Sequence, residues 1–259
     1  MVSIPRRIIH WAAAFEDGAI IRAAFFGLLS ATAVILWLDY SELSAQSPTA
    51  IAPALSPILP AFDPKSPGGA AGPEVTTPTE MLRQPLEVAL TSGGVLALTG
   101  TIDPGAADRV AAEIAAHGEY ITTVALDSPG GAVADALAIG KLIRDNGFTT
   151  SVAAGALCAS SCPLVFAGGK QRLATAQSAI GVHQIYAAAP TGSLTSRLAA
   201  AGTAMSEAQS MTAEISRYLG SMGISDEVWL RALETPPDRL SYFSTAELID
   251  LKLVTKLTT

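Results

Sequence analysis

The stretch ITTVALDSPGGAVADALAIGKLIRDNG, residues 121–147, joins a strand pattern to a helix pattern through two glycines. Residues 121–127 are β-branched and apolar, which is typical of a strand buried in a parallel sheet. The SPGG turn then breaks the chain, and apolar residues follow at helical spacing as far as Gly147, a residue type that often ends helices. This strand–turn–helix unit predicts an α/β fold.

The same alternation continues on both sides of this unit. The further strand candidates are VLALTG (95–100), TTSVAAG (149–155), RLAT (172–175) and AIGVHQI (179–185). AADRVAAEIAAH (106–117) and a stretch from about 193 to 219 have helical patterns. Repeated strand–helix units predict right-handed crossovers, with functional sites beyond the carboxyl ends of the strands.

Three chemically notable segments lie at such strand ends or close to one. DSPGG follows residues 121–126, CASSC follows 149–154, and His183 lies in the later strand. We therefore expect these segments to converge on one site.

The only two cysteines, Cys158 and Cys162, flank a pair of serines. If both lay on one helix, their Cα atoms would be about 6.2 Å apart, from helix rise and radius. That is within disulfide range, although the first helical turn would have to distort. A metal site would need further ligands at matching spacing, and the C-x-x-x-C spacing differs from the redox C-x-x-C motif. The pattern predicts a disulfide that fixes the turn carrying Ser160, and no metal site.

Ser160 is the candidate nucleophile. A serine at a helix start is well placed to attack a carbonyl, with the N–H of Ser161 receiving the oxyanion, although such a serine is also an ordinary N-cap. Gly130 and Gly131 would let the backbone approach a ligand closely, as an oxyanion hole requires, or they form only a tight turn.

A serine nucleophile needs a base, and His183 is the one histidine positioned to supply it. Its apolar neighbours equally suit a histidine satisfied within a core. A third group should orient the imidazole. Asp238 is the best-placed acid, and the alternatives are Asp226, Asp250 and Glu234.

The N-terminal part predicts a membrane anchor. Residues 23–38 carry no charge, and extension back to Ala19 gives the length that a bilayer core requires. Arg6, Arg7 and Arg22 precede the span, which leaves the N-terminus cytoplasmic. A signal peptide cleaved after Ala45 is the alternative.

The predicted organisation is therefore a cytoplasmic leader (1–18), an anchor (19–40), a disordered linker rich in Pro, Ala and Ser (41–80) and a folded domain (81–259). The net charge of −7 and the absence of a basic cluster argue against a nucleic-acid partner.

Four segments resemble, in order, the Clp protease proteolytic-subunit family and its crotonase-like superfamily. They are DSPGGAVADAL, the serine segment, AGGKQRLATAQSAIGVHQ and FSTAELIDLKLVTKL, and the resemblance covers residues 94–257. The CAS-x-C pattern is similar to that of predicted periplasmic Clp-protease-like proteins. SAIGV also resembles signal peptide peptidase A, a serine–lysine enzyme, but no lysine here matches the position of that lysine.

The resemblance implies a spiral ββα core and a protruding helix, about 193–221, that mediates oligomers in relatives. It places the nucleophile at Ser160, the base at His183 and the oxyanion donors on the amides of Gly131 and Ser161. It suggests Asp238 as the acid only if two extra residues are allowed. Cys162 and Pro163 depart from the family pattern beside the nucleophile.

These observations predict a cofactor-free serine hydrolase, a peptidase acting on peptides or proteins. We expect it to be a homo-oligomer, anchored once in the inner membrane with its domain in the periplasm. The alternatives are a non-catalytic binding or scaffold protein and, last, an acyl-CoA enzyme, for which no suitably placed acidic pair is found.

Overall fold

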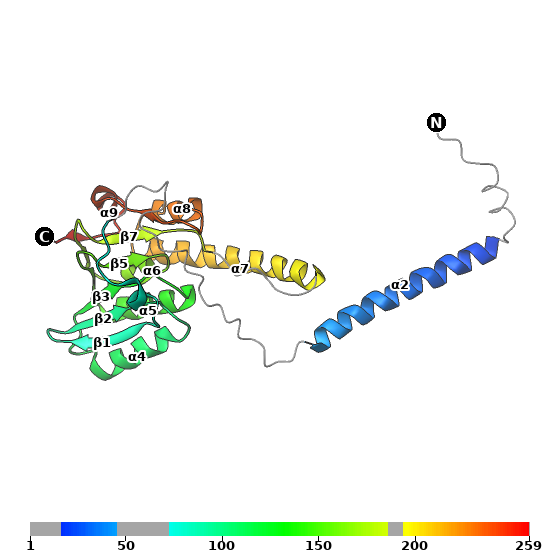
Figure 1. The fold of residues 1–259 in the computed structure, drawn as a ribbon, viewed down its shortest axis with the longest axis horizontal. Coiled ribbons are helices and arrows are strands. Elements are labelled where there is room, and N and C mark those ends of the chain that lie inside the picture. Colours follow the sequence, from blue (N-terminus) through cyan, green and yellow to red (C-terminus); the bar gives the residue numbers. More distant parts are fainter. Residues whose placement is uncertain (1–16, 46–72, 186–193, 259) are drawn as a thin grey trace, which may run out of the picture. The chain divides into compact units, whose positions relative to one another are not determined.

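The computed structural model describes residues 17–45, 73–185 and 194–258 (Figure 1). The chain divides into two compact units, residues 1–54 and 55–259. Most of the expected leader and linker lies outside the described residues, so the predictions made for those segments remain predictions.

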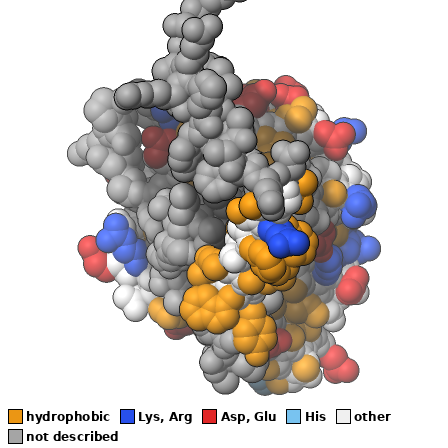
Figure 2. Space-filling model, turned by 90° about the vertical axis from the view of Figure 1, so that its right-hand side faces the viewer, with side chains coloured by type: hydrophobic (Ala, Val, Ile, Leu, Met, Phe, Trp, Pro, Cys, Tyr) orange, Lys and Arg blue, Asp and Glu red, His pale blue; other side chains and the backbone are white. Residues whose placement is uncertain are grey.

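The described part of the first unit is helix α2, Asp17–Ala45. Its segment Ile21–Leu38 has a mean hydropathy of 1.9, and none of it is buried. Figure 2 shows hydrophobic side chains gathered around a single basic one on the face that it draws. The large exposed apolar residues of α2 include Ile21, Phe25, Phe26, Leu28, Leu29, Val34, Ile35, Leu36, Trp37 and Leu38. Among the described residues, this is the one helix long and apolar enough to cross a membrane, and a signal sequence would pass the same test.

The second unit contains two sheets with helices packed around them, which confirms the mixed α/β class (Figure 1). The larger sheet has the order β1-β2-β3-β4-β6-β9, and all its pairings except β1–β2 are parallel. Its strands are Glu87–Thr91, Val95–Thr99, Thr123–Asp127, Thr149–Val152, Arg172–Ala174 and Lys256–Leu257. The smaller sheet has the order β5-β7-β8, with strands Leu157–Ala159, Ala179–Val182 and Ser241–Tyr242.

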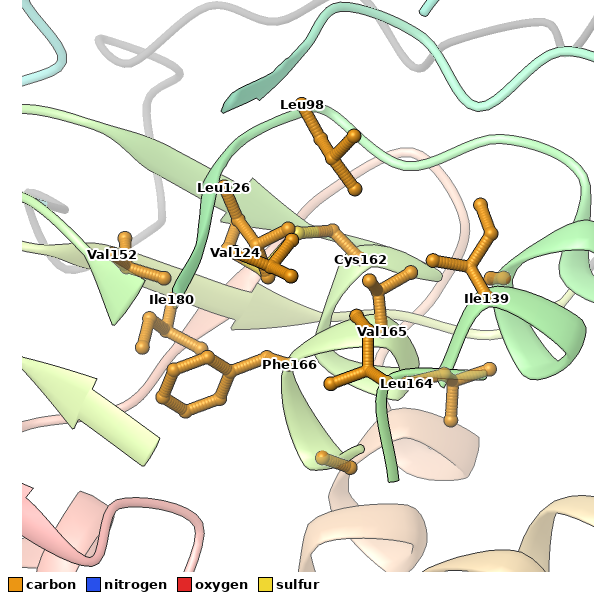
Figure 3. Packing of buried hydrophobic residues seen from close by; sticks show 14 of the residues in the cluster. Leu98, Val124, Leu126, Ile139, Val152, Cys162, Leu164, Val165, Phe166 and Ile180 are labelled. Carbon is orange, nitrogen blue, oxygen red and sulfur yellow. A yellow bond between two sulfur atoms is a disulfide. The ribbon is translucent and has the colours of Figure 1, made fainter. Parts of the chain in front are cut away.

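The helices of this unit pack around a large apolar core, drawn in part in Figure 3, except α3, whose Leu82 belongs to a second, smaller cluster. They are α3 (Thr79–Leu82), α4 (Ala106–His117), α5 (Val133–Asn146), α6 (Cys162–Ala167), α7 (Leu194–Ser221), α8 (Glu227–Glu234) and α9 (Thr245–Asp250). All six residues of α6 are buried, and Val165 and Phe166 pack with strand residues such as Val124. Because α6 follows the serine pair directly, the core fixes one side of that segment.

Ser160 is considered above as a serine at a helix start, but of the CASSC segment only Cys162 lies in α6. Cys158 lies in strand β5, and α6 begins only at Cys162. Strand β5 pairs in parallel with β7, through Leu157↔Ala179 and Ala159↔Gly181. The strand expected over 149–155 ends at Val152, before a turn in which Gly155 has φ +73°. Partners distant in sequence satisfy the backbone groups of β5, so local spacing could not reveal this strand.

The ordered domain also makes contacts before the expected start at Met81. The Thr76 amide donates to the Gly155 carbonyl at 2.9 Å, and the Thr77 hydroxyl donates to Asp127 at 2.6 Å. Helix α3 already begins at Thr79.

The chain beyond β3 joins the two sheets. The Ser128 amide donates to the Leu157 carbonyl at 2.7 Å, and the Ala159 amide donates to the Ser128 carbonyl at 3.0 Å. Asp127 accepts a further bond from the Leu157 amide at 2.9 Å. These bonds place the DSPGG turn directly beside the serine segment.

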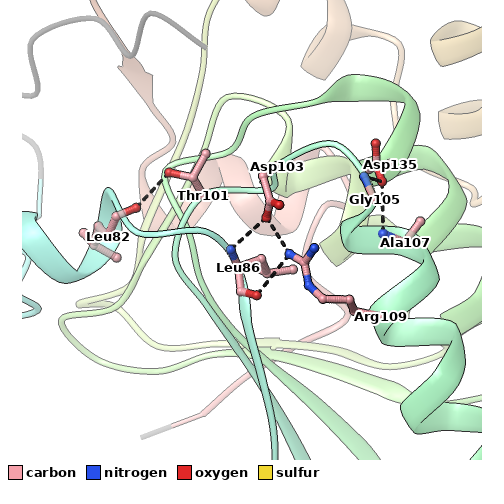
Figure 4. A network of polar contacts seen from close by, with 8 residues as sticks. All are labelled: Leu82, Leu86, Thr101, Asp103, Gly105, Ala107, Arg109 and Asp135. Carbon is pink, nitrogen blue, oxygen red and sulfur yellow. Dashed lines mark hydrogen bonds and ion pairs between the residues drawn. The ribbon is translucent and has the colours of Figure 1, made fainter. Parts of the chain in front are cut away.

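A polar network fixes the loop that supports this turn (Figure 4). Asp103 accepts hydrogen bonds from the Leu86 amide and from Arg109. Asp135 of α5 accepts bonds from the amides of Gly105 and Ala107, which caps the N-terminus of α4.

Within that loop, the Ile102 amide donates to the Gly130 carbonyl at 2.8 Å, and the Ala132 amide donates to the Ile102 carbonyl at 2.7 Å. Because Ile102 is paired on both sides of Gly131, the backbone of the glycine turn is fixed from outside the site.

Candidate active site

Ser160 lies in a sharp turn between strand β5 and helix α6. Its φ is +60°, in the left-handed region that residues with side chains rarely adopt. Its amide donates to the Gly181 carbonyl of β7 at 3.0 Å, which secures the turn. The Ser160 side chain is half-buried, whereas Ser161 is only 3% exposed. A strained strand-to-helix turn that presents a serine hydroxyl is the geometry used by the nucleophile elbow of α/β-hydrolases.

The glycine turn packs directly against this serine turn. Gly130 has φ +92°, and a Cβ there would lie 2.5 Å from the Ala159 carbonyl oxygen and 2.7 Å from the Cβ of Ser160. Gly131 has φ +146°, and a Cβ there would overlap the carbonyl of Ile102. Glycine is therefore required at position 130 for the two turns to meet, and at position 131 for the glycine turn to approach Ile102.

The predicted oxyanion donors, the amides of Gly131 and Ser161, lie at this junction. The Gly131 amide donates a hydrogen bond of 2.8 Å to the Ser161 hydroxyl oxygen. That hydroxyl donates in turn to the Gly131 carbonyl at 3.2 Å. The hydroxyl of Ser161, to which the sequence analysis assigned no role, is thus already bonded to the Gly131 amide, one of the two predicted oxyanion donors.

His183 follows directly after β7 and is 6% exposed. Ala159 pairs with Gly181 in parallel register. Ser160, which follows β5, and His183, which follows β7, therefore lie at the same end of two neighbouring strands of the small sheet. Among the described residues, no hydrogen bond joins the Ser160 hydroxyl directly to His183, although His183 does have an interaction partner. Catalytic hydrogen bonds are often long in the absence of substrate. Burial lowers the pKa of His183, while the backbone of Gln184 acts in the opposite direction, so the imidazole favours the neutral form that a base requires.

The structure does not bring Asp238 to His183. Asp238 lies between α8 and β8 with its side chain 74% exposed, and its Oδ1 is 3.6 Å from Nε of Arg239. The Gln184 amide instead donates to the Thr235 carbonyl at 2.9 Å, which ties the segment after α8 to the residue that follows His183. Of the predicted site residues, Asp238 is therefore the one whose described contacts do not support its assigned role.

A disulfide joins Cys158 to Cys162, and both residues are fully buried. It runs from strand β5 to the first residue of α6 and therefore spans Ser160 (Figure 3 shows Cys162 within the core). The bond ties together the two elements on either side of the serine turn.

Two further features of the described residues bear on the site. No group of three or more His, Cys, Asp or Glu side chains there could hold a metal ion. A groove of about 1000 Å³ runs along β8 between Pro73 and Leu248, but neither Ser160 nor His183 lines it. The groove therefore does not mark the serine turn as a binding cavity.

Comparison with known proteins gives a single kind of likeness. No protein-family model matches the chain, and no curated protein matches it either. Among solved structures, the chain is similar to a mutant of ClpP1 from Listeria monocytogenes, with a TM-score of 0.49 and 18% sequence identity. The match covers 64% of this chain and 91% of that one. The function is therefore argued from the geometry of the site.

Replacement of Gly130 by alanine should disrupt the serine turn. Gly105→Ala is a matched control, because Gly105 has φ +88° but faces open space. We expect Gly105→Ala to cost about 1–2 kcal/mol of unfolding free energy, the penalty of a left-handed residue. Gly130→Ala should cost clearly more, because backbone atoms obstruct the new methyl group. Urea unfolding of both variants measures the difference, and equal losses would contradict the close packing of the two turns.

The disulfide should matter more for the position of Ser160 than for stability. Its cysteines are only four residues apart, so chain entropy accounts for about 2 kcal/mol. In a Cys158→Ala/Cys162→Ala double variant, we expect the reaction of Ser160 with a serine-directed probe to slow by about tenfold to a hundredfold, as for a displaced reactive group. Unfolding in urea shows whether the variant is folded. An unchanged rate in the folded variant would show that the disulfide does not position the serine.

Proposed function

We propose that this protein is a serine hydrolase, and specifically a peptidase, with Ser160 as nucleophile and His183 as general base. The observation that carries the proposal is the left-handed Ser160 at the turn from β5 to α6. Its backbone is bonded to β7, the strand that His183 follows, and it packs against Gly130. A strained, non-glycine backbone at such a position is typical of functional sites.

The chemistry follows from this arrangement. Ser160 Oγ attacks the substrate carbonyl carbon, and His183 takes the hydroxyl proton. The amides of Gly131 and Ser161 stabilise the tetrahedral oxyanion. The carbon–nitrogen bond then breaks, His183 returns the proton to the leaving amine, and water hydrolyses the acyl-enzyme in the same way. Asp238 would have to exchange its contact with Arg239 for one with the imidazole in order to orient it.

The proposed setting is the periplasmic side of the inner membrane. Helix α2 would be a single-pass anchor, with the arginines before it on the cytoplasmic side, or the signal sequence of an exported protein. The disulfide supports an oxidising compartment. The proposed substrates are peptides or proteins and the proposed assembly is a homo-oligomer, both implied by the family resemblance.

A non-catalytic binding protein is the second candidate. Two observations favour it: Asp238 pairs with Arg239 rather than with His183, and the Gly131 amide is bonded to the Ser161 hydroxyl.

Labelling with a fluorophosphonate probe should distinguish the two candidates. The full-length chain in detergent should form an adduct at Ser160, identified by mass spectrometry. Ser160→Ala should abolish the adduct, and His183→Ala should slow its formation by about a hundredfold or more, the usual contribution of a general base. A folded chain that stays unlabelled, or that labels equally with Ser160→Ala, would favour the binding role. Asp238→Asn tests the acid separately, because an unchanged rate would exclude Asp238 as the orienting group.

The pH dependence of labelling should report the burial of His183. Only the neutral imidazole accepts the serine proton, and burial lowers its pKa from the ordinary value of 6.5. The rate should therefore stay high as the pH falls past 6.5 and decline only at lower pH. His117→Gln, at an exposed histidine, is the control and should not move the curve. A midpoint at or above 6.5 in the native chain would contradict this assignment.

A further inference from the structure

The hydroxyl of Ser161 is bonded to the Gly131 amide, one of the two proposed oxyanion donors. The donor–acceptor distance of this bond is 2.8 Å. Ser161 precedes helix α6, but its side chain makes no capping bond to that helix, so helix capping does not explain the position of the hydroxyl. From this contact we infer that Ser161 Oγ is a placeholder in the oxyanion hole, which must rotate away before the site can stabilise a transition state. The inference rests on the proposed function and adds a positioning residue to it.

The unused amide of Ser161 supports this assignment. Among the described residues, the Ser161 amide has no hydrogen-bond acceptor. The Gly131 amide, the second proposed donor, is the one that the hydroxyl occupies. A substrate carbonyl oxygen that displaces the hydroxyl would accept the Gly131 amide hydrogen and find the Ser161 amide available.

The backbone around the placeholder is fixed, whereas the side chain can turn. Gly131 is held by the pairing of Ile102 with Gly130 and Ala132. Ser161 Oγ is held by one bond of ordinary length and by a longer one of 3.2 Å to the Gly131 carbonyl. A single rotation about χ1 exchanges this hydroxyl for a substrate oxygen without movement of the turn. A water molecule bonded to the Gly131 amide could leave the site, whereas the Ser161 hydroxyl is attached to the chain and stays beside the amide.

Removal of the hydroxyl should therefore speed the acylation of Ser160. We expect Ser161→Ala to react about fivefold faster with a fluorophosphonate, the factor that corresponds to one hydrogen bond of ordinary net strength. In this reaction the Ser160 oxygen–phosphorus bond forms, the phosphorus–fluorine bond breaks and fluoride leaves. The serine proton goes to His183, and the phosphoryl oxygen takes the oxyanion position. The measured quantity is the second-order rate constant on the full-length chain in detergent.

Two further variants separate this role from a structural one. Ser161→Thr restores a hydroxyl and should bring the rate back down toward that of the native chain. Ser178→Ala is the matched control: Ser178 is 2% exposed, accepts the Thr175 amide at 2.8 Å and donates to the Val152 carbonyl at 2.7 Å. It precedes β7 at the end remote from His183, so its loss should lower stability and leave the labelling rate unchanged.

The outcomes are distinct. A Ser161→Ala variant that labels faster than the native chain supports the placeholder. If Ser160 labels in the native chain but Ser161→Ala is equal or slower, the placeholder is wrong and the hydrolase stands. If no variant labels, both the hydrolase and the placeholder fall. Should the alanine variant fail to fold by circular dichroism, Ser161→Gly provides the same comparison.

Discussion

The parallel pairing of β5 with β7 is the constraint on which the site depends. It aligns Ala159 with Gly181, so the chain leaves both strands at one edge, with Ser160 on one side and His183 on the other. The bond from the Ser160 amide to the Gly181 carbonyl extends this pairing into the turn itself. Together with the bonds with Ser128, this pairing keeps β5 extended up to the turn in which Ser160 adopts its left-handed conformation.

Three further restraints act on the same turn from different directions. The glycine turn approaches from the large sheet, where only residues without a Cβ fit against Ala159 and Ser160. The disulfide ties β5 to α6, and the fully buried α6 holds the other end in the core. Each restraint comes from a different segment of the chain, so local strain at Ser160 is balanced by long-range contacts.

The parts of this arrangement that were predictable are those with a local signal. Apolar periodicity and Gly147 predicted α5, as the structure shows. Residue chemistry indicated Ser160, Gly131 and His183, whose catalytic roles stay predictions. Strand β5 was missed because its three residues, Leu157–Ala159, are too few to show a periodicity, and its partners in β7 lie about twenty residues away in sequence. The Ser161–Gly131 bond was also missed, since it depends on how two turns meet. Asp238 was chosen from its neighbours in sequence, which say nothing about its exposure.

Two side chains, Ser161 and Asp238, do not have the contacts that the proposed catalytic site requires. They differ from the groups that build the serine turn, which belong to the backbone and the core. Strand pairing, the glycine contacts and the disulfide involve backbone and core, and changing them would require unfolding. The Ser161 hydroxyl turns about one bond, and Asp238 lies on an exposed loop between α8 and β8. Because the Ser161 hydroxyl moves by rotation about one bond, substrate binding could supply the free energy for its displacement. The fold would then hold the proposed nucleophile in place and leave the proposed stabilising groups to respond to the substrate.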